Sequence, residues 1–113
     1  MKAPFPKFKF KNDAYTRRRG TPAMLMISCA GCNQLVMGYQ KDGPGPLLRC
    51  YLDRIHYPTD LSSLQHQEFD KDAFPHLVCP SCQVVIGTVM IYEKENRPAY
   101  LMRKGFFKRK KVY

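Results

Sequence analysis

The chain has 113 residues, 44% of them hydrophobic, and a formal net charge of +10. This length favours a single domain. The longest apolar run, residues 84–91, is shorter than the roughly 18–20 residues that cross a membrane, and the basic N-terminus lacks the apolar core of a secretory signal. We therefore expect a soluble chain with no membrane partner.

The positive charge is concentrated at the two ends of the chain. Residues 1–20 carry seven basic residues and one acid, whereas residues 97–113 carry seven basic residues and no acid. Residues 21–96 are mildly acidic, with five basic and eight acidic residues. Like-charge blocks at chain ends commonly bind polyanions. We predict a basic N-terminal arm over residues 1–20, a folded domain over residues 21–102 and a basic C-terminal tail over residues 103–113.

The first twenty residues predict an extended, aromatic arm. Lysine and phenylalanine alternate from Lys7 to Lys11, and Pro4 and Pro6 disfavour a helix. In such a segment the cations can neutralise phosphates while the rings stack on bases. A solvated, disordered tail and an edge strand are the alternatives that this pattern leaves open.

The middle of the chain predicts short strands joined by turns. Its apolar runs predict strands at residues 24–27, 35–37, 84–92 and 100–102, the second of which stops near Gly38. The sequence Asp-Gly-Pro-Gly-Pro at residues 42–46 is typical of a turn. Residues 57–75 show little periodicity beyond a short helix through Leu61 and Leu64.

Alternation over residues 47–55 predicts one further strand. Leu48, Cys50 and Leu52 are expected on its buried face. Cys50 is expected to be a small buried hydrophobic residue. The polar face, with Arg49, Asp53 and Arg54, forms either a set of surface ion pairs or part of a binding surface, and the sequence does not decide between them.

Four of the five cysteines form two Cys-x-x-Cys pairs. Four thiolates in such pairs are the usual ligand set of one tetrahedral zinc ion, and we predict that Cys29, Cys32, Cys79 and Cys82 bind it. Each pair is followed by an apolar stretch and a glycine, which supports two matched halves around one metal. His76 lies close to the second pair, but four cysteines leave no need for a histidine ligand.

The predicted zinc ion is structural, because four cysteine ligands leave no open position for water. The expected fold is therefore mainly β: a small zinc-stapled antiparallel sheet, like a zinc ribbon, with extended basic N- and C-terminal arms. A rubredoxin-like iron site, and with it a metal–thiolate redox protein, is an alternative. Reduced thiols favour a cytoplasmic or similarly reducing compartment.

The second cysteine pair also carries a family resemblance. The run Cys79-x-x-Cys82-x-x-x-Ile86-Gly87, with Tyr92 and Lys104-Gly105-Phe106 downstream, resembles the C-terminal half of β-tent zinc proteins. These include the Yippee proteins, the thalidomide-binding domain of cereblon and the methionine-R-sulfoxide reductases. The separation of the two pairs is also similar. Residues 43–55 look in addition like small uncharacterised prokaryotic zinc-ribbon proteins.

The resemblance implies a zinc-held β fold without implying an activity. The reductases have a catalytic cysteine on a late strand, whereas Tyr100 to Arg103 contain none, and the thalidomide pocket is lined by tryptophans, which this chain lacks. The sequence of the chain also contains no phosphate-binding glycine loop, nucleophile elbow or paired catalytic carboxylates. We therefore expect a protein that is not an enzyme.

The basic ends favour an RNA-binding protein, such as a component or companion of the ribosome or another large nucleoprotein. RNA is favoured over DNA, the free chain is expected to be a monomer, and other proteins of a large assembly are possible partners. A protein-binding or small-ligand-binding β-tent module with solvated tails is the alternative. The predicted nucleic-acid-binding residues are Lys7, Lys9, Lys11, Arg17, Arg18, Arg19, Arg103, Lys104, Lys108, Arg109, Lys110 and Lys111.

Overall fold

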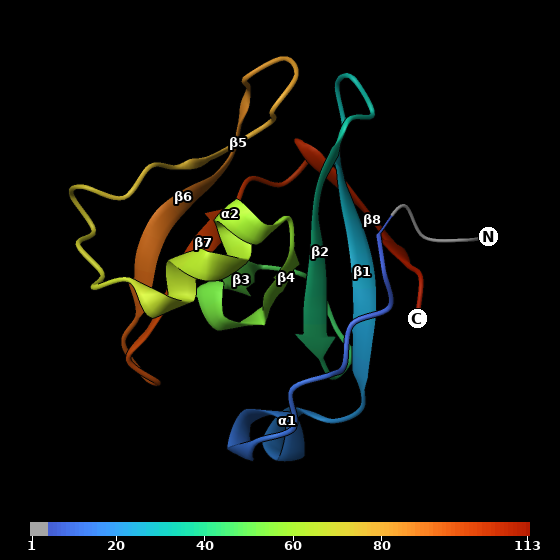
Figure 1. The fold of residues 1–113 in the computed structure, drawn as a ribbon, viewed down its shortest axis with the longest axis vertical. Helices are drawn as coiled ribbons and strands as arrows, with labels where there is room; N and C mark the ends of the chain where they lie inside the picture. Colours follow the sequence, from blue (N-terminus) through green and yellow to red (C-terminus); the bar gives the residue numbers. More distant parts are fainter. Residues whose placement is uncertain (1–4) are drawn as a thin grey trace.

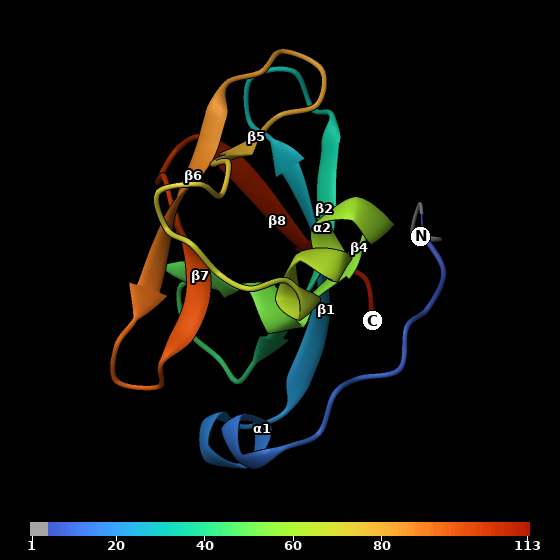
Figure 2. The same cartoon turned by 60° about the vertical axis from the view of Figure 1, so that its left-hand side comes forward.

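A computed structural model describes residues 5–113 of the chain. These residues form two four-stranded antiparallel sheets that face each other (Figure 1, Figure 2). The strand order is β4-β2-β1-β8 in the first sheet and β3-β7-β6-β5 in the second. The strands are β1 (Pro22–Cys29), β2 (Leu35–Asp42), β3 (Arg49–Tyr51), β4 (Ile55–Tyr57), β5 (Leu77–Val78), β6 (Val85–Tyr92), β7 (Arg97–Met102) and β8 (Phe107–Lys111). The mainly β, antiparallel fold is therefore as predicted.

Short helices complete the described part of the chain. Helix α1 (Ala14–Arg19) precedes the first strand, and its N-terminus is capped by the Asp13 side chain, which accepts from the backbone N–H groups of Tyr15 and Thr16. The predicted short helix near Leu61 is α2 (Thr59–Ser62), followed by a turn of 3₁₀ helix at Ser63–His66. No helix in residues 5–113 is long and apolar enough to cross a membrane.

Strand β1 is covered on both faces, which explains its uninterrupted apolar sequence. Leu25 and Ile27 belong to the main core between the two sheets, together with side chains such as Ile86 of β6. Met24 and Met26 belong to a second, smaller cluster. Because neighbouring residues of a strand point to opposite faces, this division follows from the sequence order of the four residues.

The N-terminal segment (residues 5–13) forms the cover of this second cluster. Phe5 is buried there, and Phe8 and Phe10 pack against the cluster half-buried. The ring of Phe5 stacks on Tyr57 of β4 at 5.4 Å and lies over Gly38 of β2. The predicted extended N-terminal arm is not confirmed, since these rings pack on the protein instead of being free to stack on bases. Residues 1–4 of that arm, including Pro4, lie outside the described residues.

The C-terminal tail is likewise not confirmed as an extended arm. Its residues 107–111 form strand β8, which pairs with β1 from Leu25↔Lys111 to Cys29↔Phe107 and is an edge of the first sheet. The chain end folds back further, because the Met24 N–H donates to the carbonyl of Tyr113 at 3.1 Å. Residues near both ends of the described chain therefore meet on the first sheet, where the Tyr113 hydroxyl donates to the carbonyl of Phe5 at 3.4 Å.

Two predictions about the strands were wrong in detail. Strand β2 does not stop near Gly38 but continues to Asp42, since it is paired with β1 along its length. Residues 47–55 do not form one strand: after β3 a 3₁₀ turn at Leu52–Arg54 carries the chain from the second sheet to β4 of the first. The alternation fails on both sides of β3: Leu48, which precedes the strand, is 56% exposed, and Arg54, at the end of the 3₁₀ turn, is 1% exposed.

Candidate functional site

The two Cys-x-x-Cys loops have the same backbone conformation. In the first loop the Cys29 N–H donates to the carbonyl of Gln34 at 2.9 Å, and the Asn33 N–H donates to the carbonyl of Cys29 at 2.9 Å. The same two bonds, each 3.0 Å long, recur in the second loop at Cys79 and Gln83. Asn33 and Gln83 both have φ 64°, a left-handed conformation that asparagine adopts readily. Each loop therefore presents its two sulfurs in the same way.

The two cysteine loops lie at the same end of the molecule (Figure 1), and their four sulfurs are close together. All four are within 4.8 Å of one another, and the pairs Cys29–Cys82 and Cys32–Cys79 are 3.7 and 3.5 Å apart. A tetrahedron with zinc–sulfur bonds of about 2.3 Å has edges of about 3.8 Å, whereas a disulfide is about 2.05 Å long. The sulfurs are thus spaced as metal ligands, and all the cysteines are free.

This arrangement fits a structural metal ion supplied with four sulfur ligands. Two of the cysteines, Cys29 and Cys79, are buried, and Cys32 and Cys82 are exposed. Burial opposes ionisation of Cys79, but hydrogen bonds from the backbone N–H groups of Cys82 and Ser81, and the Cys32 side chain, lower its pKa to about 6. For Cys82 the backbone N–H of Val84 is outweighed by burial and by the neighbouring thiols of Cys29, Cys79 and Cys32, which raise its pKa to about 11. A thiolate is the form that binds zinc. The predicted set of four ligands is therefore brought together.

The remaining cysteine and the nearby histidine lie outside this set. Cys50 is fully buried in the main core, and burial raises the pKa of its thiol well above the usual value. The Nδ1 atom of His76 accepts from the backbone N–H of Val89 at 3.1 Å. Neither residue belongs to the cysteine cluster found among residues 5–113.

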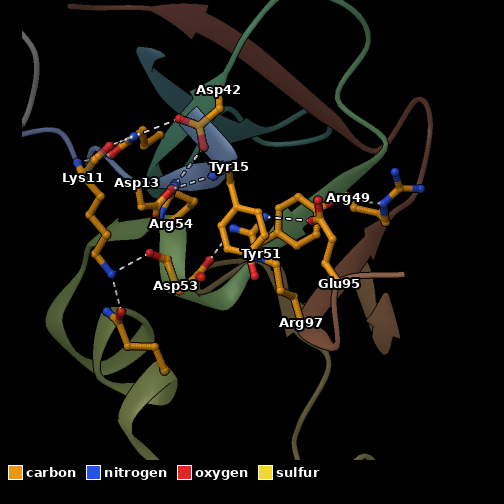
Figure 3. A network of polar contacts seen from close by, with 12 residues as sticks. Lys11, Asp13, Tyr15, Asp42, Arg49, Tyr51, Asp53, Arg54, Glu95 and Arg97 are labelled. Carbon is orange, nitrogen blue, oxygen red and sulfur yellow. Dashed lines mark hydrogen bonds and ion pairs between the residues drawn. The ribbon is translucent and has the colours of Figure 1, made fainter. Parts of the chain in front are cut away.

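At the end of the molecule away from the cysteine loops, a network of charged residues joins the two sheets to the N-terminal segment (Figure 1, Figure 3). Arg54 donates from Nε to Asp42 of β2 at 2.8 Å and from Nη2 to Asp13 at 2.6 Å. The desolvation of Arg54 is offset by these two carboxylates, so its pKa is raised. The sequence prediction placed Arg54 on a polar face and did not foresee its burial.

A second arginine of this network, Arg97 of β7, is held between two aromatic rings. Its guanidinium carbon lies 3.8 Å from the ring centroids of both Tyr15 and Tyr51, a cation–π geometry. Nη2 donates to Asp53 at 2.7 Å and Nη1 to Glu95 at 3.1 Å. Since Tyr15 belongs to α1, this contact ties the basic N-terminal residues to the second sheet.

Several predicted nucleic-acid-binding residues of the N-terminal part take part in such contacts. Lys11 donates from Nζ to the carbonyl of Asp53 and to Gln65, whereas Arg18 and Arg19 both pair with Glu95, at 3.1 and 2.7 Å. Lys7 lies over the ring of Tyr113. Lys9 and Arg17 are exposed.

The predicted residues of the C-terminal part lie together on and beside β8. The four consecutive residues 108–111 are all exposed, and so are Arg103 and Lys104. Some of them make polar contacts: Arg109 donates to the carbonyl of Gly45 at 3.1 Å, Lys108 donates to Asn33, and Arg103 donates to the carbonyl of Val85 at 3.0 Å.

Three adjoining hollows follow this basic edge. The first, of about 410 Å³, lies beside Lys108 and Lys110; the second, of about 380 Å³, lies beside Lys104. Arg109 borders both of them. The third, of about 390 Å³, shares Pro46 to Leu48 with the second and extends to Lys41 and Arg49.

The linings of these hollows contain far more basic than acidic side chains. Together they contain seven basic side chains and one acidic side chain, Asp42. Sequence reasoning missed Lys41 altogether, because a single lysine before a turn carries no local signal. For Arg49 it left two roles open, because a position on the polar face of a strand suits an ion pair as well as a binding surface.

Comparisons of the chain with protein-family models, with curated proteins and with solved structures found no match. The resemblance to the β-tent proteins therefore has no support from related proteins. What the structure itself provides is a small antiparallel β fold with four clustered cysteines.

Proposed function

We propose that this chain is a non-enzymatic zinc-binding β-tent protein that binds RNA through its basic C-terminal edge. The zinc ion has a structural role at Cys29, Cys32, Cys79 and Cys82, and the free chain is a monomer. The setting that suits it best is the ribosome or another large ribonucleoprotein. Two features support the β-tent assignment: two antiparallel sheets, and one cysteine pair from each sheet at their common end.

The single observation that carries RNA binding is the charge of the three adjoining hollows beside β8. Seven cations against one acid make a surface of one sign, whereas an ordinary soluble surface mixes signs. Neutralising phosphates is the main source of affinity for nucleic acids. The hollows also form depressions into which a nucleic-acid strand can fit. A row of lysines on a flat sheet edge would not provide such depressions.

A structural explanation of the β8 charges is protection of a sheet edge. Lysine on an edge strand discourages pairing with a second chain. That role explains charges on edge strands, which include β8 and also β3 with Arg49. Two other cations of the third hollow, Lys41 on the inner strand β2 and Arg19 in α1, are not explained by edge protection.

RNA is preferred to duplex DNA because of the elements available for recognition. The helices described in residues 5–113 have at most six residues, so the chain offers no long recognition helix for a major groove. Unpaired single strands and loops of RNA are flexible and present separated phosphates and bases, which suit small hollows.

The test is the salt dependence of binding to a fluorescent single-stranded oligoribonucleotide. We expect the logarithm of affinity to fall linearly with the logarithm of salt concentration, by about 0.7 per phosphate neutralised. Changing Lys108, Arg109, Lys110 and Lys111 to Gln is expected to reduce this slope by about 2–3, since up to four contacts are removed. The matched control changes Lys71 and Lys94, two exposed lysines outside the hollows, to Gln.

The control is expected to bind as the parent does. Zinc content and thermal unfolding of the β8 variant show whether its sheet is retained. A well-folded β8 variant with unchanged affinity and slope would contradict the proposal, and so would an absence of binding at low salt.

A further inference from the structure

The third hollow differs from the other two because its lining combines cations with tyrosine rings. It lies next to the turn at residues 43–46 and is bordered by the ends of β2, β3 and β6. Its lining includes the rings of Tyr39, Tyr51 and Tyr92. Tyr39 is 2% exposed, so the hollow reaches the edge of the main core. We call it the inner cavity.

Two cations of the inner cavity have no carboxylate partner in the described part of the chain. Lys41 donates from Nζ to the carbonyl of Gly43 at 2.7 Å, and Arg49 donates from Nε to the hydroxyl of Tyr51 at 3.3 Å. No ion pair of residues 5–113 includes either of them. In Figure 3 the guanidinium of Arg49 points away from the carboxylate of Glu95.

The acidic groups around the inner cavity are already engaged. Asp42, the one acid in its lining, accepts from Arg54 at 2.8 Å and from Gln40 at 2.9 Å. Glu95 accepts from Arg18, Arg19 and Arg97, and so it leaves Arg19, the third cation of the lining, only partly neutralised. The cavity therefore holds an excess of positive charge.

The environment of Lys41 shows the same excess. Burial lowers the pKa of Lys41, and the neighbouring charges of Arg109 and Arg19 lower it further, which Asp42 offsets only in part. Lys41 is half-buried, and its neighbouring cations repel it. An anion in the cavity would relieve this repulsion.

The position of Arg49 is set by an aromatic ring. Its guanidinium carbon lies 4.0 Å from the centroid of Tyr92, which in turn packs edge-on against Tyr51 at 6.0 Å. Stacking on a ring restricts the planar guanidinium and leaves its Nη donors available at the cavity. Arg49 is thus preorganised as a donor to an anion, since a fixed fork loses less entropy on binding.

We propose that the inner cavity binds a small molecule that carries a phosphomonoester group, with Arg49 and Lys41 as the phosphate-binding residues. A phosphomonoester carries up to two negative charges and three acceptor oxygens, which match a forked guanidinium and an ammonium. A volume of about 390 Å³ exceeds that of a phosphate alone and is in the range of ligand pockets. Pro44, Pro46 and Leu47 supply an apolar wall for the rest of the molecule.

The test uses AMP, inorganic phosphate and adenosine as probes in calorimetric and NMR titrations of the zinc-loaded protein. We expect AMP to bind and inorganic phosphate to compete with it, while adenosine binds at least about tenfold more weakly than AMP because it lacks the charge. Amide shifts are expected at residues 41–49 and at Tyr92. Absence of AMP binding, or equal binding of adenosine, would overturn the proposal.

The variants Arg49→Gln and Lys41→Gln are each expected to weaken AMP binding by about tenfold or more, since each removes a charged hydrogen bond. Lys94→Gln, an exposed lysine in the turn after Tyr92, is the matched control and should bind as the parent does. Zinc content and unfolding temperature must stay at parental values in each variant. Unchanged AMP affinity in folded Arg49→Gln and Lys41→Gln would place the ligand elsewhere and refute the assignment.

This proposal and RNA binding fail separately. The β8 variant is expected to lose less AMP affinity than Arg49→Gln or Lys41→Gln, because no β8 residue lines the cavity and Arg109 acts there only as a neighbouring charge. An oligoribonucleotide with a 5′-hydroxyl carries only phosphodiesters, whereas its 5′-phosphorylated form carries one phosphomonoester. Competition of only the phosphorylated form with AMP would identify a strand end as the source of the group, whereas competition by neither form would identify a free small molecule.

Discussion

Arg54 shows how one residue connects three separate segments. Its guanidinium is 1% exposed and joins Asp42 of β2, Asp13 before α1 and the hydroxyl of Thr16 within α1. A buried pair is weak evidence of net stabilisation, but removing one partner leaves the other charge buried. Nη1 of Arg54 has no hydrogen-bond partner among the described residues, so the network is not fully satisfied. Its role is therefore to fix the arrangement of the segments as much as to add stability.

We predict that Arg54→Met destabilises the protein by about 3–5 kcal/mol, because Asp42 would remain buried without its cation. Asp13→Asn is expected to cost less, since the Asp13 side chain is 42% exposed. Urea denaturation of the zinc-loaded protein measures both changes. Arg17→Met, an exposed arginine of α1, is the control and should stay within about 0.5 kcal/mol of the parent. A loss in Arg54→Met no larger than that of the control would show that the ion pairs are not needed.

At the scale of elements, the N-terminal segment packs on the outer face of the first sheet and belongs to the folded structure. The fit is closest between Phe5 and Gly38, where a Cβ atom added at Gly38 would lie 2.9 Å from the Phe5 ring. This distance is too short for any side chain, so the glycine in the middle of β2 is explained by the ring above it. The glycine also explains why β2 continues past it: the residue serves packing and does not end the strand.

We predict that Gly38→Ala destabilises the parent by about 1–3 kcal/mol through overpacking against Phe5. In a Phe5→Ala background the same change is expected to be close to neutral, because the ring that it meets is gone. The measurement is a double-mutant cycle by urea denaturation, supported by limited proteolysis of residues 5–13. Equal costs of Gly38→Ala in the two backgrounds would refute the contact.

The apolar parts of β1, β2, β6 and β7 and the cysteine cluster could be predicted from the sequence because their signals are local, whereas β8 was not predicted as a strand. Strand β6 follows from an apolar run, and the metal ligands follow from a spacing within each loop. The packing of the N-terminal segment on the first sheet could not be predicted. It depends on Met24, Met26 and Gly38, which lie far along the chain from Phe5. The burial of Arg54 likewise depends on partners 12 and 41 residues away.

At the scale of the whole molecule, the two sheets are joined at both ends by different chemistry. The cysteine loops meet at one end, while Arg54, Arg97 and α1 connect the sheets at the other (Figure 2). The main core lies between these two connections. The inner cavity adjoins the charged connection through Arg19 and Asp42, and the basic edge reaches the first cysteine loop at Asn33, so the geometry of each depends on the connection beside it.

We predict that removing the metal unfolds the protein. Structural zinc supplies about 10–16 kcal/mol in small zinc-binding peptides, which is comparable to or larger than the total stability of a small domain. A strong chelator is expected to abolish the near-ultraviolet circular dichroism of the tyrosines, and added zinc should restore it.

Cys29→Ser and Cys79→Ser, one from each loop, are expected to lose bound zinc and the same signal. The control is Cys50→Ala, which removes a fully buried thiol outside the cluster and should keep one zinc ion while losing about 1–2 kcal/mol of stability. A native-like signal that survives chelation would contradict the prediction and would mean that the main core and the charged network of Arg54 and Arg97 hold the two sheets together without the metal.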